Sequence, residues 1–270
     1  MDNTPKSCYT YCRRVPFEEL TLADDFLFCK VMQNEKLCKE LLEIILHVKV
    51  EKIVYTETQK VLDNTIDEKS VRMDVYVEDD KHTVYDIEMQ TSDTKELPKR
   101  SRYYHSCIDK SQIAKGEPYN KLRKTYVIFI CTFDLFDRNF AKYEFDTICK
   151  QDKSLILADD RHTIFVNAEG ITNDQQLKEF LNFLKTGEVT KSPFILDLSK
   201  EVRLASRNSK WKEEYDMLLA YDERKQKEGQ EQIILRALQK HSPEVVAEFL
   251  DIPLEEVVEV QKKQVVQNTP

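Results

Sequence analysis

Carboxylates that could share a divalent cation occur in two neighbouring segments of the chain. Residues 71–77 alternate between apolar and other residues, and a strand with this pattern would present Asp74 on its polar face. In residues 83–90 the same alternation puts Asp86 and Glu88 on one face. Hydrolysis of a phosphodiester requires charge neutralisation and a hydroxide near neutral pH, and a divalent ion such as Mg²⁺ supplies both. The pattern therefore indicates a carboxylate pair suited to metal-assisted hydrolysis.

A turn-like segment, residues 78–81, joins the two strands and predicts a hairpin. If the loop has an odd number of residues, the polar faces coincide and Asp74 lies opposite Asp86 or Glu88. Mg²⁺ is usually held by one or two carboxylates and otherwise by water and substrate phosphates, so Asp74 and Glu88 suffice as protein ligands. Gln90 follows on the same face and can orient the attacking water, but it cannot supply a positive charge.

The same alternation also has an ordinary structural explanation. An antiparallel hairpin commonly carries polar residues on a face that is simply exposed to solvent. Taken alone, the spacing of Asp74, Glu88 and Gln90 favours this explanation over a metal site.

Elements around the hairpin indicate an α/β fold. Apolar residues recur at helical spacing in residues 26–46, where Asp24 and Asp25 favour a helix start. A β-like pattern follows in residues 48–59, and the polar stretch Asp63–Ser70 is predicted to be a loop. With 270 residues, 41% of them hydrophobic and 33% charged, the chain can bury a full core and carry a second, smaller unit.

Several function classes are disfavoured by the composition. The longest apolar run, residues 41–48, is too short to span a membrane, and residues 1–16 lack the apolar stretch of a secretory signal. We therefore expect a cytoplasmic protein. The seven cysteines form no CxxC pair and are expected to be reduced, mostly buried thiols. No glycine-rich phosphate loop is present.

The formal charge of −8 is unfavourable for binding a phosphate backbone, but the charge is unevenly distributed. Residues 95–124 contain nine basic and three acidic residues, about +6, which leaves about −14 for the rest. Because this segment follows the carboxylate hairpin, we expect it to bind DNA. His105 is expected at the surface. The candidate contacts are Lys99, Arg100, Arg102 and Tyr103.

The C-terminal region, residues 221–270, differs in character. A charged run up to Gln232 predicts an exposed helix or linker, and two short helices should follow, the first capped by Ser242 and Pro243. A break at Asp251–Pro253 makes this pair similar to a helix-turn-helix. The early turn of its second helix is acidic, whereas DNA recognition would require basic or amide groups. We therefore favour packing or homo-oligomerisation as its role.

Several sequence blocks resemble the Rpn-like recombination-promoting nucleases, also described as PD-(D/E)XK transposases. Residues 72–76 (RMDVY) and 85–90 (YDIEMQ) are similar to two signatures of that family. The similarity extends from about residue 20 to about residue 230. Further blocks in the family's order are 25–31, where Cys29 replaces the usual lysine, 102–104, 115–119, 125–131, 165–167 and 211–215.

The resemblance implies a restriction-endonuclease-like core, in which a mixed central β-sheet is flanked by helices. It also implies a Mg²⁺ or Mn²⁺ ion held by Asp74, Glu88 and the main-chain carbonyl of Met89, with Asp25 assisting from the first helix. Gln90 occupies the position of the superfamily's usual lysine, so a slower or more metal-dependent nuclease is expected.

We accordingly expect an N-terminal extension (1–19), a nuclease-like domain (20–220) and a helical C-terminal region (221–270). The expected activity is metal-dependent endonucleolytic cleavage of DNA, linked to recombination or transposition. The alternative is a weak or inactive nuclease-fold protein that serves as a DNA-binding or protein-interaction module.

Overall fold

The computed structural model describes residues 15–62 and 71–267, so the loop predicted for Asp63–Ser70 lies outside the described residues. The chain divides into two compact units. One is the continuous segment Glu18–Asn208, and the other combines the described ends of the chain, residues 15–17 and 209–267. No helix in the described parts of the chain is long and apolar enough to cross a membrane.

A six-stranded mixed sheet forms the centre of the larger unit, with the order β1-β2-β3-β4-β6-β5. Strands β1, β2 and β3 pair antiparallel, β3 pairs with β4 and β4 with β6 in parallel, and β5 returns antiparallel to β6. The strands are β1 (Ile53–Leu62), β2 (Val71–Asp79), β3 (Val84–Gln90), β4 (Thr125–Cys131), β5 (Lys142–Phe145) and β6 (Arg161–Asn167). The predicted α/β class with a mixed sheet is confirmed.

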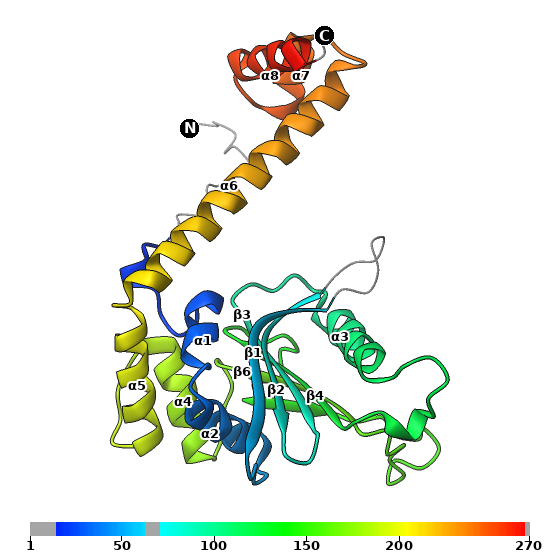
Figure 1. Ribbon diagram of the computed structural model, residues 1–270, viewed down its shortest axis with the longest axis vertical. Helices are drawn as coiled ribbons and strands as arrows, with labels where there is room; N and C mark the ends of the chain where they lie inside the picture. The colour runs from blue at the N-terminus through cyan, green and yellow to red at the C-terminus, as the bar shows by residue number, and fades with distance from the viewer. Residues whose placement is uncertain (1–14, 63–70, 268–270) are drawn as a thin grey trace. The chain divides into compact units, whose positions relative to one another are not determined.

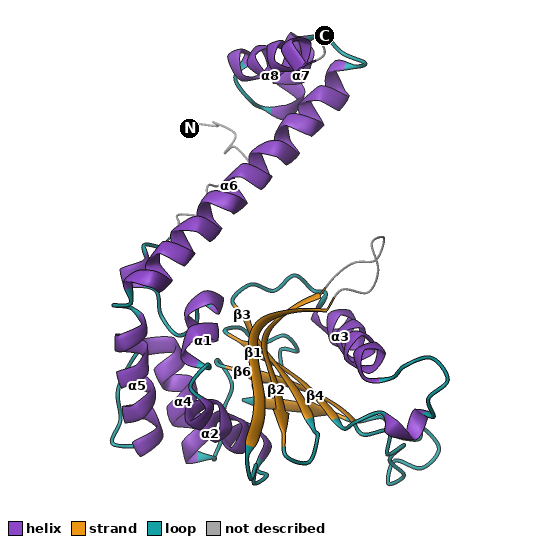
Figure 2. Cartoon of the chain, in the orientation of Figure 1, coloured by secondary structure: helices purple, strands orange, loops and turns teal. Residues whose placement is uncertain are grey.

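Helices cover both faces of this sheet. Figure 1 shows α3 against one face and α1, α2, α4 and α5 on the other, and Figure 2 shows the strands between these two helical layers. The bounds are α1 (Asp25–Val31), α2 (Glu35–Leu46), α3 (Leu97–Gln112), α4 (Gln175–Thr186) and α5 (Pro193–Ala205), with short 3-10 helices at Phe17–Glu19 and Tyr119–Lys121. Because both faces are covered, β4 is apolar over nearly its whole length (TYVIFIC).

The predicted start of the first helix is confirmed. Asp24 is the N-cap of α1, and its carboxylate accepts a hydrogen bond from the Leu27 amide at 3.2 Å. Nearly every residue of α1 is buried, which fixes the helix against the sheet. The Cys29 thiol also donates to the main-chain carbonyl of Asp74 at 3.2 Å. Helix α1 therefore lies beside Asp74 of β2.

Four cysteines are buried free thiols, as predicted: Cys29, Cys38, Cys107 and Cys131. Burial raises the pKa of both the Cys38 and the Cys131 thiol to about 12, so these sulfurs stay protonated and unreactive at neutral pH. The other positions are the half-buried Cys149 and two residues, Cys8 and Cys12, that lie outside the described part of the chain.

The smaller unit is helical and has a core of its own. Its helices are α6 (Ser209–Leu238), α7 (Pro243–Leu250) and α8 (Leu254–Gln267), and its core includes Ile234, Val246 and Val257. Ser242 is the N-cap of α7 with Pro243 in its first turn, as predicted, and the break before Pro253 separates α7 from α8. Helix α6 continues through residues 220 and 221, where the sequence suggested a boundary, and the charged run up to Gln232 is part of it.

Candidate metal centre

The register of the β2–β3 hairpin brings the predicted residues to one place. Val75 pairs with Ile87 and Glu78 pairs with Val84, so residues 79–83 form a loop with an odd number of residues. Extending this register puts Asp74 opposite Glu88, on the same face of the sheet. The paired register of β2 and β3 ends at Val75 and Ile87, although β2 continues alongside β1 and β3 alongside β4. The strands therefore separate at Asp74 and Glu88.

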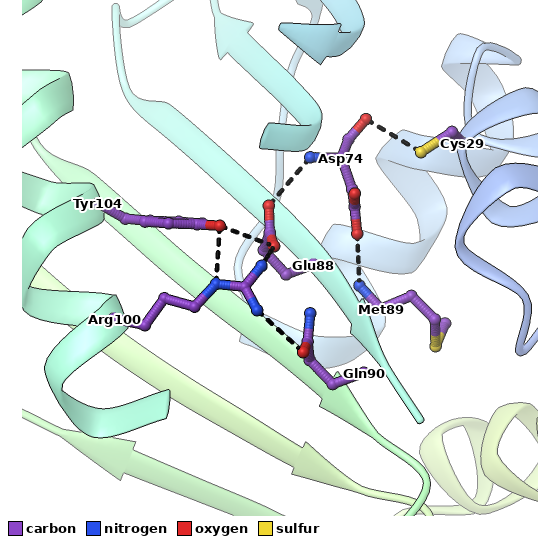
Figure 3. Close-up of polar contacts among 7 residues, drawn as sticks. All are labelled: Cys29, Asp74, Glu88, Met89, Gln90, Arg100 and Tyr104. Carbon is purple, nitrogen blue, oxygen red and sulfur yellow. Dashed lines mark hydrogen bonds and ion pairs between the residues drawn. The ribbon is translucent and has the colours of Figure 1, made fainter. Parts of the chain in front are cut away.

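Where β2 and β3 separate, two side-chain carboxylates accept main-chain hydrogen bonds in place of those that would join the two strands. The Asp74 amide donates to Glu88 Oε1 at 2.9 Å, and the Met89 amide donates to Asp74 Oδ2 at 3.1 Å (Figure 3). Each carboxylate thus binds the main chain of the strand opposite its own. This reciprocal exchange holds the two acidic groups together at the end of the hairpin.

The main-chain carbonyl of Met89 lies on the same side of β3 as these carboxylates. In a strand, the N–H and C=O of one residue point to the same neighbour, and the Met89 amide points to Asp74. The next residue alternates, because the Gln90 carbonyl accepts from the Thr132 amide on the β4 side at 3.0 Å. The Met89 carbonyl therefore points towards β2, as its amide does.

The face that carries these groups is covered by protein, so an ordinary solvent-exposed hairpin does not explain them. Asp86 and Glu88 are both 0% exposed, since α3 packs over this face of β3. Burial is the main cause that raises the pKa of Glu88, and the nearby charge of Asp74 adds to it, whereas Arg100 lowers it. Buried like charges of this kind are costly unless a cation compensates them.

Asp86 is the least compensated group of the centre. Neither of its carboxylate oxygens has a hydrogen-bond partner among the described residues. Burial, followed by the charges of Glu88 and Asp74, raises its pKa well above the ordinary range. The charged form of Asp86 is therefore disfavoured at this buried position.

Arg100 reaches the centre from α3 and contacts it through three N–H groups. Its Nη2 donates to Glu88 Oε2 at 2.6 Å, its Nη1 donates to Gln90 Oε1 at 3.0 Å, and its Nε donates to the Tyr104 hydroxyl at 2.8 Å (Figure 3). Tyr104 is buried, and its hydroxyl donates to Glu88 Oε2 at 3.4 Å. The sequence suggested Arg100 as a DNA contact but did not indicate its pairing with Glu88, because the two residues are on separate elements.

A polar cleft of about 350 Å³ opens beside these groups. It is lined by residues of α1, β2, β3 and α3, which include Asp24, Asp25, Asp74, Gln90 and Arg100. Asp25 is exposed, and its carboxylate accepts a hydrogen bond from the neighbouring Phe26 amide at 2.8 Å. Burial raises the pKa of Asp24 to about 6. The sequence indicated Asp24 only as a residue that favours a helix start. Its position next to Asp25, a candidate site residue, was the signal that could have indicated a place in the cleft.

The other candidate DNA contacts lie on the solvent side of α3. Lys99 and Arg102 are exposed, and Tyr103 is 36% exposed. In contrast, the expectation that His105 lies at the surface is wrong. Its side chain is buried, with Nδ1 2.9 Å from Thr125 Oγ1 and Nε2 3.1 Å from Thr163 Oγ1, because it faces the sheet.

The chemistry of the donors fits a hard divalent cation. The described residues contain no group of three His, Cys, Asp or Glu side chains that could hold a metal by themselves. Two carboxylates and one carbonyl nevertheless match the usual protein contribution to Mg²⁺, whose remaining ligands are water and phosphate oxygens. The unpartnered Asp86 oxygens and the excess of buried acids over Arg100 also indicate a place where added positive charge is stabilising.

Comparison with known protein families identifies the family to which the α/β fold belongs. Residues 23–236 match the model of the PD-(D/E)XK nuclease family transposases. The chain belongs to this family. The suspected resemblance is therefore confirmed, and divalent metals are generally used by PD-(D/E)XK nucleases. No curated protein and no solved structure matched the chain.

Proposed function

We propose that this protein is a metal-dependent endonuclease that hydrolyses phosphodiester bonds of DNA during recombination or transposition. The observation that carries the proposal is the reciprocal exchange between Asp74 and Glu88 beside an open polar cleft. A carboxylate pair that was needed only for stability would not require a cleft of this size and polarity at its side. Membership of a nuclease family supports the same activity.

Asp74, Glu88 and the Met89 carbonyl would hold Mg²⁺ or Mn²⁺. When bound, such an ion neutralises charge on the phosphate and lowers the pKa of a water molecule. Gln90 directs its carbonyl oxygen to Arg100, so its amide N–H₂ group is left to hold a water in the cleft that it lines. Asp25, across the cleft on α1, can accept a proton or a hydrogen bond from that water.

The DNA backbone would lie along the exposed side of α3. Lys99 and Arg102 present positive charge there, and the ring of Tyr103 can stack on a base. The same helix carries Arg100 into the centre, so a phosphate bound by the exposed residues is brought next to the cleft.

A cleavage assay tests the proposal directly. Supercoiled plasmid is incubated with the full-length protein in Mg²⁺ or Mn²⁺, alongside Asp74→Asn and Glu88→Gln. We expect nicked and linear products from the wild type and a loss on the order of 100-fold or more in both variants. Asp80→Asn is the matched control, since Asp80 is an exposed carboxylate in the turn of the same hairpin.

The outcomes separate the two candidate functions. Undiminished cleavage in Asp74→Asn and Glu88→Gln would refute the site. If the wild type binds DNA but cleaves none with any divalent ion, the protein is instead a DNA-binding module with a nuclease fold. The pairing of Glu88 with Arg100 is the feature that favours this second function, because it occupies a carboxylate that the metal requires.

A further inference from the structure

The centre contains a positively charged side chain, Arg100. It does not come from position 90 of β3, where the superfamily usually has a lysine and this chain has a glutamine. Gln90 is neutral and ends the β3 strand beside the carboxylates. The guanidinium of Arg100 lies next to it, donating to both Gln90 Oε1 and Glu88 Oε2 (Figure 3). Arg100 is also the cation whose charge acts on both Glu88 and Asp86.

The surroundings of Arg100 hold its guanidinium in a defined orientation. Arg100 Cζ lies 5.0 Å from the ring centroid of Tyr104 and 5.6 Å from that of Phe129, and its Nε donates to the Tyr104 hydroxyl. Tyr104 and Phe129 are both buried, so they cannot move aside easily. The planar group is therefore fixed before any substrate arrives.

Arg100 still has donors for a ligand. The three hydrogen bonds found among the described residues use three of the five guanidinium N–H groups. The side chain is 34% exposed and lines the cleft. A phosphate oxygen in the cleft can accept from the remaining N–H groups while the contacts to Glu88 and Gln90 persist.

Gln90 and Arg100 are chemically matched to each other. A guanidinium has donors only, so the partner side chain must present an acceptor, and the Gln90 carbonyl oxygen does so. A lysine at position 90 would place a second cation against Arg100 and break this contact. The neutral acceptor of Gln90 therefore suits this arrangement, whereas a lysine does not.

We propose that Arg100 is a catalytic residue that stabilises the charge on the scissile phosphate in place of a strand lysine, and that Gln90 is the positioning residue that holds it. This inference rests on the proposed nuclease function. In this arrangement the positive charge at the centre comes from α3 instead of β3.

The test uses charge exchange between the two positions in the full-length protein. We expect Arg100→Gln to lower kcat on the order of 100-fold with little change in KM. Gln90→Lys alone should also lower kcat, since two cations then repel each other. The double variant Gln90→Lys with Arg100→Gln should recover at least about 10-fold relative to Arg100→Gln, because the charge returns from the strand. Arg203→Gln, an exposed arginine on α5, is the matched control.

A second readout does not depend on turnover. Titration of each protein with Mn²⁺ alone, followed by electron paramagnetic resonance, gives the metal affinity. Arg100→Gln should bind Mn²⁺ at least as tightly as the wild type, because the cation that competes for Glu88 is removed. Asp74→Asn should bind it more weakly. A purely structural Arg100 would instead lose both metal affinity and activity when it is replaced.

The results distinguish this inference from the function on which it rests. If the wild type cleaves DNA and Arg100→Gln cleaves equally well, the role of Arg100 is refuted and the nuclease function stands. Failure of the double variant to exceed Arg100→Gln, or a weakened Mn²⁺ affinity in Arg100→Gln, also refutes it. A wild type that cleaves nothing with any divalent ion overturns both.

Discussion

Lowering the pH should destabilise the protein because of His105, whose side chain hydrogen-bonds α3 to strands β4 and β6 of the sheet. The imidazole is 2% exposed, and burial, aided by the charge of Arg161, lowers its pKa from 6.5 to about 3. Its two nitrogens bind the hydroxyls of Thr125 and Thr163, which suits a neutral ring with one donor and one acceptor. The folded protein therefore keeps His105 neutral down to low pH.

The sign and size of the effect follow from proton linkage. The unfolded chain takes up a proton near pH 6.5, whereas the folded chain does not, so the contribution to stability is complete above that pH. It declines as the pH falls from about 6.5 towards 3. At about pH 5 the difference is roughly 1.5 pH units, or about 2 kcal/mol of unfolding free energy.

Urea unfolding followed by far-UV circular dichroism measures this quantity. Wild type and His105→Gln are compared in EDTA at about pH 7.5 and about pH 5. The wild type should lose about 2 kcal/mol more than the variant on acidification, although the variant is less stable at neutral pH. His82→Asn is the control, an exposed turn residue whose φ of 63° asparagine tolerates, and it should match the wild type. Equal pH dependence in wild type and His105→Gln would refute the reasoning.

Two further predictions concern the centre and the DNA surface. Asp86→Asn should stabilise the metal-free protein near pH 7, because burial and the neighbouring acids raise the pKa of this carboxylate and the asparagine carries no charge. The gain should disappear as the pH falls below 3.8, where the unfolded carboxylate is also protonated, and thermal unfolding in EDTA that shows a loss at pH 7 would contradict it. Lys99→Gln and Arg102→Gln should each weaken DNA affinity uniformly across sequences and reduce its logarithmic salt dependence by about one. Fluorescence anisotropy at several salt concentrations measures this, and an unchanged salt dependence would exclude these residues as phosphate contacts.

Much of the fold could be predicted locally. The residues that begin α1 and α7 were recognised because helix caps depend on a few adjacent side chains, as at Asp24 and Ser242. Strand β4 coincides with residues 125–131, one of the blocks that carry the family resemblance, and its continuous apolar run reflects burial on both faces. The shared face of Asp74 and Glu88 followed from alternation and loop parity, which are also local properties.

Other features depended on residues that are distant in the sequence. His105 was expected at the surface because it belongs to no cluster of histidines with metal-ligand spacing, yet the side of α3 that meets the sheet is decided by packing against β4 and β6. Arg100 was assigned to DNA because it lies within a basic segment. Its partner Glu88 is 12 positions away on another element, and no periodic pattern links a helix position to a strand position.

The amino-acid sequence by itself determined which acidic residues share a face and, through its family blocks, which fold carries them, because strand alternation and capping act over a few residues. Only the tertiary structure decided that Asp86 and Glu88 are buried, that β2 and β3 separate at Asp74 and Glu88, and that Arg100 lies beside the neutral Gln90. These outcomes require α3 to close over the sheet. Burial and charge compensation arise from such long-range packing, and the electrostatics of the centre follow from it.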